Sequence, residues 1–290
     1  MRVAVIGAQG QLGTDLCAAY RAAGGDVREL NRPGIDVADA DSCRRAIEES
    51  APDLVINTAA LHHVETCESD PARAHAVNSI GARNLALLAR EKSFALVQVS
   101  TDYVFDGGKG APYVEQDSPL PLNVYGNSKL AGEQYVRTLA PRHFVVRVSG
   151  LFGRAPCRAK GGLNFVQLML KLARERGEVR VVDSERLCPT HTLDVAEQLV
   201  ALTGTDCYGL YHMASREGCS WHEFAQAIFE LTGTSVNLRV AGPNEFPAKV
   251  PRPGDSRLEN RALSTLGLNR MPHWRAGLER YLALTRPAAA

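Results

Sequence analysis

The stretch that decides the fold is VAVIGAQGQLG, residues 3–13, which joins an apolar run to a glycine-rich turn. Its first four residues predict a buried parallel strand, and a helical pattern follows at about Leu12–Ala23. Gly7 allows the chain to turn sharply off the strand, and the missing side chain at Gly10 lets the backbone approach a pyrophosphate. At Gly13 the missing side chain lets helix and sheet pack closely, and the helix N-terminus attracts the anion. An ordinary glycine-bearing turn is the alternative, but a strand before the glycines and a helix after them favour a dinucleotide-binding loop.

Outward from this stretch, short β-branched runs alternate with longer helical patterns. The predicted strands are Val3–Ile6, Val27–Leu30, Leu54–Asn57, Ala95–Val99 and Phe144–Val148. The predicted helices are Leu12–Ala23, Ser42–Glu49, Ala72–Glu91 and Val124–Leu139. Asp70 can cap the third helix, and Pro71 suits its first position. This alternation predicts a parallel sheet with helices on both faces, that is, a doubly wound α/β fold of the Rossmann type.

The second half of the chain has a looser rhythm. Its signals are a basic loop with Arg158 and Lys160, a helix near Asn164–Arg176, a strand at Val179–Val182, a helix at Leu193–Leu202, a capping box at Ser220–Glu223 and a proline-rich loop at Pro243–Pro253. We predict that the strand and helix within residues 177–204 return to the sheet. The predicted division is a dinucleotide-binding domain of residues 1–149 with 177–204, and a smaller C-terminal substrate lobe of residues 150–176 and 205–290.

Composition limits the partners. The chain has 290 residues, 45% of them hydrophobic, and its 33 basic and 32 acidic side chains leave a net charge of +1. Binding to nucleic acid or to an anionic membrane normally needs a surplus of Lys and Arg, so neither is predicted as a partner. No apolar run approaches the ~20 residues that cross a bilayer, and we expect no leader before the first strand. The seven cysteines are scattered without a Cys-x-x-Cys pair, which favours reduced thiols in a cytoplasmic protein over disulfides or zinc.

Two residues four positions apart, Tyr125 and Lys129, share one face of the fourth predicted helix. Most such pairs are solvated surface, but this pair follows the fourth strand of a dinucleotide fold, where ligands bind off the carboxyl ends of the strands. A phenol with an ordinary pKa of ~10 is a slow proton donor to a forming alkoxide, and a nearby ammonium lowers that pKa. Thr101, at the end of the fourth strand, could hold a carbonyl oxygen beside the phenol. The alternative is a strand-end cap for Thr101 and core packing for Tyr103.

The end of the second strand bears on the choice of cofactor. A ribose diol is usually held there by an acidic side chain, whereas a 2′-phosphate prefers arginine. This strand ends with Asn31 and Arg32 at its tip and no acid. The pattern favours NADPH, and Asp36 slightly further on leaves NADH open.

Five segments carry a family pattern: Gly10–Gly13 (GQLG), Pro52–Ala60 (PDLVINTAA), Ser100–Gly107 (STDYVFDG), Pro121–Glu133 (PLNVYGNSKLAGE) and Arg252–Leu258 (RPGDSRL). Together they resemble the dTDP-4-dehydrorhamnose reductase family, a branch of the extended short-chain dehydrogenases. The resemblance runs from Met1 to about Tyr281. It implies reduction of the 4-keto group of dTDP-4-dehydro-6-deoxy-L-mannose to dTDP-L-rhamnose, a precursor of cell-surface polysaccharide.

The resemblance also implies roles for particular residues. Tyr125 would be the proton donor, Lys129 its partner on the nicotinamide ribose, and Thr101 a third catalytic group. The predicted cofactor contacts are Gly7, Gly10, Gln11, Leu12, Gly13, Asn31, Arg32, Asp36, Val37, Ala59, Ala60, Leu61, Val99, Tyr125 and Lys129. The predicted substrate contacts are Thr101, Asp102, Tyr103 and Asn164. The expected partner is a nucleotide sugar, the expected cofactor is NADPH, and a homodimer is left open.

One departure from the family pattern concerns the substrate. After the fifth strand the family usually reads Arg-Thr-Ser-Trp, with the aromatic ring against the sugar, whereas residues 147–150 of this chain read Arg-Val-Ser-Gly. Either Leu151 or Phe152 replaces that wall, or the substrate differs.

The group of His62, His63 and Cys67 lacks a suitably spaced fourth ligand, so no metal is predicted. Trp221 is expected only to pack at the start of a helix.

Two rival functions fit parts of the pattern. A sugar-nucleotide epimerase or dehydratase could use the same scaffold, but dehydratases of this group place Glu after the Asp of the Thr-Asp pair, where this chain has Tyr103. A non-catalytic, NADP-binding regulatory subunit is disfavoured by the presence of Thr101, Tyr125 and Lys129. Gly150, which removes the family's aromatic wall, keeps that second rival open.

Overall fold

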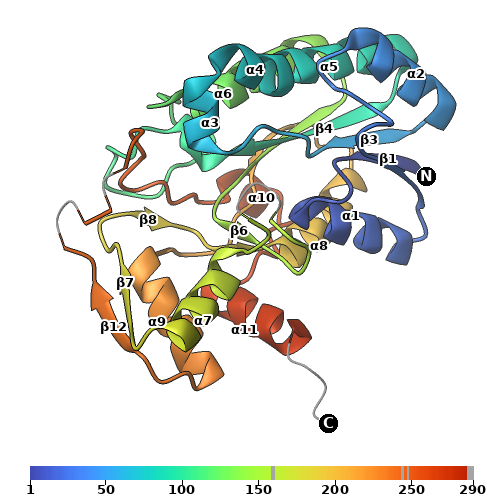
Figure 1. Cartoon of the computed structure of the whole chain (residues 1–290). Helices are drawn as coiled ribbons and strands as arrows, with labels where there is room; N and C mark the ends of the chain where they lie inside the picture. The colour runs from blue at the N-terminus through green and yellow to red at the C-terminus, as the bar shows by residue number, and fades with distance from the viewer. Residues whose placement is uncertain (158–160, 243–244, 247, 286–290) are drawn as a thin grey trace.

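The computed structural model describes residues 1–157, 161–242, 245–246 and 248–285 (Figure 1). The predicted loop residues Arg158 and Lys160, the prolines at 243 and 247, and residues 286–290 of the predicted substrate lobe lie outside the described residues. Among the helices that are described, none is both long and apolar enough to span a membrane. Each of the seven cysteines is a free thiol.

A six-stranded sheet forms the centre of the molecule, and all its neighbouring strands are parallel. Its strands are β1 (Arg2–Ile6), β2 (Asp26–Leu30), β3 (Leu54–Asn57), β4 (Ala95–Thr101), β5 (His143–Val148) and β10 (Gly209–His212), in the order β10-β5-β4-β3-β1-β2. The chain moves to opposite sides of β1, first to β2 and then to β3, which creates a crevice at the carboxyl ends of β1 and β3. The five predicted strands are confirmed to within two residues at each end.

Helices cover both faces of this sheet (Figure 1). They are α1 (Gln11–Ala22), α2 (Ala40–Ser50), α5 (Gly81–Lys92), α6 (Val124–Leu139) and α8 (Thr192–Thr203). Leu16 of α1 and Leu199 of α8 belong to the core on one face, whereas Ile47 of α2, Leu85 of α5 and Val136 of α6 belong to the core on the other. This two-sided packing confirms the doubly wound α/β fold.

The helix predicted over Ala72–Glu91 is interrupted. It consists of α4 (Pro71–His75), one π-helical turn η1 (Ala76–Ile80) and then α5. Asp70 caps it as predicted, its side chain accepting the N–H of Arg73 at 3.0 Å. In the π-helical turn, Asn78 donates to the Ser128 hydroxyl of α6 at 2.9 Å, a tertiary contact that periodicity along one helix cannot reveal.

The prediction that a strand at Val179–Val182 returns to the central sheet is wrong. This strand, β7 (Glu178–Val181), pairs instead with β12 (Asn237–Val240), and the sixth strand of the central sheet is β10. The predicted helix at Leu193–Leu202, by contrast, does pack on the sheet as α8. A short apolar run cannot by itself show which sheet it joins, and β10 was missed because its sequence, GLYH, has no β-branched residue.

A second hydrophobic core lies beside the sheet, in the lower part of Figure 1. It is built by β7, β12, α7 (Phe165–Glu175), α9 (Trp221–Thr232) and α11 (Trp274–Thr285). Phe152, Phe224 and Leu278 are buried at its centre. The predicted capping box at the start of α9 is confirmed, with Ser220 and Glu223 bonded reciprocally. The remaining short elements are α3 (Val64–Ser69), η2 (Asp102–Val104), β6 (Leu151–Phe152), β8 (Arg186–Leu187), β9 (Thr190–His191), β11 (Cys219–Ser220) and α10 (Arg261–Thr265).

Candidate active site

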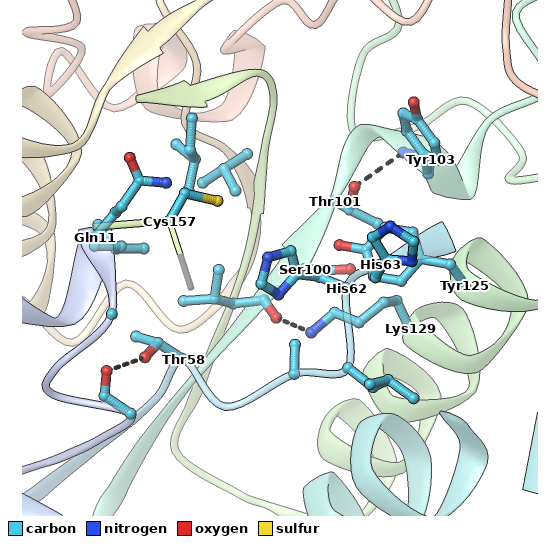
Figure 2. Close-up of a pocket in the computed structure, with 18 of the residues that line it drawn as sticks. Gln11, Thr58, His62, His63, Ser100, Thr101, Tyr103, Tyr125, Lys129 and Cys157 are labelled. Carbon is cyan, nitrogen blue, oxygen red and sulfur yellow. Dashed lines mark hydrogen bonds between the residues drawn. The ribbon is translucent and has the colours of Figure 1, made fainter. Parts of the chain in front are cut away.

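A cavity of about 930 Å³ opens at the carboxyl ends of the central strands. Its walls come from the segments that follow β1 to β5 and from α6, α7 and α9. Of the residues predicted to bind cofactor or substrate, all except Asp36 line this cavity. The fold therefore brings together groups that are far apart in the sequence, as Figure 2 shows for Gln11, Thr101, Tyr125 and Lys129.

The glycine loop between β1 and α1 has a shape that depends on its glycines. Gly7 has a φ of +80°, and a Cβ at Gly13 would lie 2.2 Å from the carbonyl oxygen of Gly7. Gly10 is the N-cap of α1 and offers no side chain to the first N–H groups, which leaves them available to an anion. The side-chain Oδ1 of Asn31 accepts the N–H of Gln9 at 3.0 Å and holds the loop against the end of β2.

The tip of β2 presents a cation to the cavity. Arg32 lines the cavity, and its guanidinium lies 3.2 Å from the carboxylate of Asp36. Asp36 itself lies outside the cavity wall and also accepts the N–H of Ala38 at 3.0 Å. Asp36, the carboxylate that kept NADH possible as the cofactor, therefore lies outside the cavity wall and is paired with Arg32.

The carboxyl end of β4 meets α6 at the predicted catalytic residues. Lys129 is buried, and its Nζ donates to the carbonyl oxygen of Val99 at 2.6 Å (Figure 2). The Thr101 hydroxyl lies beside the Tyr125 phenol and accepts the N–H of Tyr103 at 3.2 Å. The rings of Tyr103 and Tyr125 meet edge to face at 5.8 Å. The phenol, the ammonium and the threonine hydroxyl are thus gathered at one end of the cavity.

Burial controls the protonation of this pair. Removal from water raises the pKa of the Tyr125 phenol, and the hydrogen bond with Thr101 opposes that change. Burial lowers the pKa of Lys129 to about 8. The expectation that the ammonium lowers the pKa of the phenol is therefore wrong for this state, because desolvation outweighs it and the amine is bonded to the Val99 carbonyl. Tyr125 keeps its proton at neutral pH.

Asp102 was predicted to contact the substrate, but its carboxylate is occupied by the protein. It accepts the hydroxyls of Thr101 at 3.0 Å, Ser149 at 2.8 Å and Ser256 at 2.7 Å. Burial raises the pKa of this carboxyl group, and the hydroxyl hydrogen bonds oppose the rise. Asp102 therefore ties the ends of β4 and β5 to the late segment that contains Ser256.

Asn164 was also predicted to contact the substrate, and its amide is likewise used within the protein. Its Nδ2 donates to the carbonyl oxygen of Gly153 at 2.9 Å and to the Tyr281 hydroxyl at 3.0 Å, while its Oδ1 caps α7. Gln11 holds the other side of the same peptide segment, since its Oε1 accepts the N–H of Gly153 at 3.0 Å. Asn164 lines the cavity but has no amide N–H left for a sugar.

Among the cavity residues that were not predicted as contacts are Arg252 and Trp221. Arg252 lines the cavity and donates to Glu65 at 2.6 Å, and its Nε is buried without a hydrogen-bond partner. The motif RPGDSRL contains Arg252 but gives no indication of where its side chain lies. Trp221, expected only to pack at a helix start, also lines the cavity; its ring lies 4.5 Å from that of Phe165, and its Nε1 donates to Glu185.

The space beside Gly150 is filled. This glycine has a φ of +54°, and a Cβ would lie 2.7 Å from Leu187 Cδ1 and 3.1 Å from the carbonyl oxygen of Cys188. Both residues expected to replace the aromatic wall line the cavity: Phe152 is buried and also belongs to the second core, and Leu151 is half-buried. The apolar surface at this point comes from Leu151, Phe152 and Leu187.

Of the two histidines after β3, both of which line the cavity, His63 has a local hydrogen-bonding role. The His63 ring accepts the N–H of Thr66 at the start of α3. The Cys67 thiol donates to the carbonyl oxygen of Leu61 at 3.3 Å. Across the described ranges, no three His, Cys, Asp or Glu side chains gather as a metal-ligand set.

Comparisons with known proteins agree with this geometry. A family model described as the RmlD substrate binding domain matches residues 1–286. The spore coat polysaccharide biosynthesis protein SpsK of Bacillus subtilis is 38% identical over 97% of this chain and 96% of its own length. The dTDP-4-dehydrorhamnose reductase of Sinorhizobium fredii is 35% identical over 97% of this chain and 96% of its own length.

A comparison with solved structures leads to the same group of proteins. The crystal structure of dTDP-4-dehydrorhamnose reductase from Bacillus anthracis in complex with NADP superposes with a TM-score of 0.93 at 36% identity, covering 98% of this chain and 99% of that one. These matches extend over both cores and the whole cavity. The chain belongs to the RmlD substrate-binding-domain family, the family of the dTDP-4-dehydrorhamnose reductases.

Proposed function

We propose that this protein uses NADPH to reduce the 4-keto group of a dTDP-linked 6-deoxysugar, with dTDP-4-dehydrorhamnose as the substrate and dTDP-L-rhamnose as the product. The observation that carries the proposal is the position of Tyr125, Lys129 and Thr101 at one end of a cavity whose other end is the glycine loop. The named reductases among the relatives support the substrate and the cofactor.

The residues at the glycine loop fit a dinucleotide phosphate. A Cβ at Gly7 would lie 2.6 Å from the Thr58 hydroxyl, so the loop backbone stays close to β3, and the uncapped N-terminus of α1 suits a pyrophosphate. Arg32 is placed to bind a 2′-phosphate at the tip of β2. When bound, the nicotinamide would supply the hydride, and every proton step then belongs to the protein.

Tyr125 is the proton donor in this proposal. Its raised pKa keeps the phenol protonated, and the partner hydroxyl of Thr101 orients it toward the cavity end. Lys129 places a positive charge next to the site where the phenolate forms, and its amine is held on the Val99 carbonyl until a cofactor hydroxyl is present. Thr101, whose hydroxyl donates to Asp102 at 3.0 Å in this structure, would turn that proton to the keto oxygen and hold it beside the phenol.

The substrate would lie between the sheet and the second core. We keep the two-domain division as part of the proposal, with β10 moved to the dinucleotide-binding part and β7 to the substrate lobe. Tyr103, Trp221 and Leu187 offer apolar surface to the sugar and the base. Arg252, with a buried and unpartnered Nε, is the cation placed to hold the diphosphate.

The rival functions are less well supported. Dehydratase chemistry needs a second acid beside Asp102, but Tyr103 follows it and Asp102 is bonded to three hydroxyls. A regulatory subunit would have no need for the buried Lys129 beside Tyr125. To test the proposal, the protein is mixed with NADPH and dTDP-4-dehydrorhamnose, and the absorbance of the reduced cofactor is followed. We expect steady oxidation, and binding of NADPH without any oxidation would reject the reductase.

The pH dependence follows from Lys129. Because burial lowers the pKa of Lys129 to about 8, its ammonium is present below that pH and is lost as the pH rises through it. Tyr125 has a raised pKa and keeps its proton over the same range. We therefore expect kcat/KM for the ketosugar to fall tenfold per unit above pH ~8. A profile of kcat/KM from pH 6 to 10 measures this fall. Lys129→Arg is the control, and its slower rate should not change over the same range. A wild-type profile that stays level to pH 10 would contradict the role of the Lys129 ammonium.

The cofactor preference depends on Arg32. A charge-assisted contact to a phosphate is worth about 1.5–3 kcal/mol, so Arg32→Ala should weaken NADPH binding by about 10- to 100-fold. NADH, which lacks the 2′-phosphate, should lose little. Asp36→Asn is the matched control, because it removes the carboxylate that competes for Arg32 and should tighten NADPH binding. Fluorescence titration of both cofactors decides the matter, and an equal loss for NADH would remove Arg32 from phosphate recognition.

A further inference from the structure

A fully buried ion pair lies behind the proposed catalytic residues. Arg147 of β5 donates from Nε to Glu133 Oε1 at 2.9 Å and from Nη2 to Glu133 Oε2 at 2.7 Å. The two side chains are 1% and 0% exposed. Neither residue lines the cavity, so neither touches cofactor or substrate directly.

Glu133 continues the row of functional groups on α6. Tyr125, Lys129 and Glu133 follow one another at intervals of four residues and therefore share one helix face. All three contact the end of β4: the phenol meets the Thr101 hydroxyl, the amine meets the Val99 carbonyl, and Glu133 Oε1 accepts the Ser100 hydroxyl at 2.5 Å. Glu133 thus fixes α6 to β4 immediately beside the contact made by Lys129.

The arginine is held on its other sides as well. Its Nη1 lies 3.5 Å from Nε2 of His212 on β10, and its guanidinium lies over the Phe105 ring at 5.0 Å. The His212 Nδ1 lies 3.0 Å from the carbonyl oxygen of Tyr113, and burial beside Arg147 lowers the pKa of His212 to about 3. The histidine is therefore neutral, and among the described residues the only carboxylate within ion-pair distance of Arg147 is Glu133.

Stability alone is a weak explanation for such a pair, since the cost of removing two charges from water often cancels their attraction. The position of the ion pair relative to Lys129 gives a better explanation. The groups that raise the pKa of Lys129 against burial are Glu133 on its own helix and Cys67 on α3. Burial raises the pKa of the Cys67 thiol to about 11, so this group is neutral at pH 7. Tyr125 is also protonated there, which leaves Glu133 as the anion acting on the amine.

We infer that Glu133 is a positioning residue for the proposed reduction: clamped by Arg147 and Ser100, it keeps Lys129 positively charged and holds α6 at the distance from β4 that the phenol and the amine require. Arg147 orients Glu133 and prevents it from taking the amine as a direct partner. The inference rests on the proposed function for its kinetic part only, because the charge of Lys129 can be measured without turnover.

The test replaces Glu133 by glutamine, which keeps the shape and removes the charge. The chain has six lysines, so the Cε signal of Lys129 in lysine-labelled protein can be assigned by its loss in Lys129→Arg and titrated by NMR. We expect Glu133→Gln to lower the pKa of Lys129 by about one unit or more, which reduces the ammonium fraction at pH 8 from about one half to about one tenth or less. The alkaline limb of kcat/KM should move by the same amount. A folded Glu133→Gln protein with an unchanged titration would overturn the inference.

Two further variants separate positioning from loss of fold. Glu133→Gln/Arg147→Gln removes both buried charges, so no lone charge opposes folding, and it should still show the lowered titration. Asp194→Asn is the matched control, because it breaks another pair with a buried carboxylate, Asp194–Arg280 at 2.6 Å, away from the cavity. It should reduce stability and leave both the titration and the kinetic limb in place. If the wild type never turns over the ketosugar, the proposed function fails while the NMR result still decides the role of Glu133.

Discussion

Tyr125→Phe is expected to lower kcat for ketosugar reduction by about 10²- to 10⁴-fold, the usual contribution of a positioned general acid. The phenol beside Thr101 is the protonated group at the cavity end, and phenylalanine keeps the ring while removing the proton. NADPH affinity should change little, because the glycine loop and Arg32 lie at the other end of the cavity. Stopped-flow absorbance with saturating NADPH measures the loss in a single turnover.

The adjacent phenol provides the control for this experiment. Tyr103 packs edge to face on Tyr125 at 5.8 Å and lines the same cavity, so Tyr103→Phe removes a hydroxyl nearby without removing the proposed donor. It should affect KM more than kcat. Equal kcat losses in the two variants, or full turnover in Tyr125→Phe, would mean that the proton comes from elsewhere.

Arg252→Gln is expected to raise the KM for the nucleotide sugar by about 30-fold or more, because losing one side of a desolvated charge contact costs ~2–5 kcal/mol. The lower part of that range applies, since the side chain is 32% exposed. The loss should fall on binding and leave kcat nearly unchanged. Calorimetry with dTDP alone, in the presence of NADP, should show the same weakening without any dependence on the sugar.

Arg257→Gln is the matched control for Arg252. Arg257 lies in the same segment and is paired with Asp255 at 2.6 Å, but it does not line the cavity. A similar KM increase in both variants would show that the segment, and not the Arg252 cation, is responsible. A small effect of Arg252→Gln on dTDP binding would place the diphosphate elsewhere.

The parts of the site that were predictable are those encoded locally. The glycine loop needs a turn, a close approach and a helix start within eleven residues, and each requirement marks a particular glycine. The spacing of Tyr125 and Lys129 is likewise a property of one helix. The five strands that make most of the sheet could be read from their β-branched runs, since such runs favour a pleated, buried surface.

The parts that were not predictable depend on contacts between distant segments. Asp102 appeared free to bind a sugar because nothing in the sequence indicates that Ser149 and Ser256 converge on it. The π-helical turn exists where Asn78 reaches α6, and the partner of β7 lies nearly sixty residues further on in β12. In each case the decisive hydrogen bond closes a long loop, and local pattern carries no information about such closure.

Gly150 and Leu187 pack so closely that a side chain at position 150 would collide with the leucine. A tryptophan at position 150 would need two changes: a backbone outside the left-handed region and a smaller residue at 187. A variant that carries the tryptophan alone would therefore be strained. The two positions should be exchanged as a unit when segments are swapped between this chain and its relatives. With Leu187 in that space, a larger side chain at position 150 alone would collide with it.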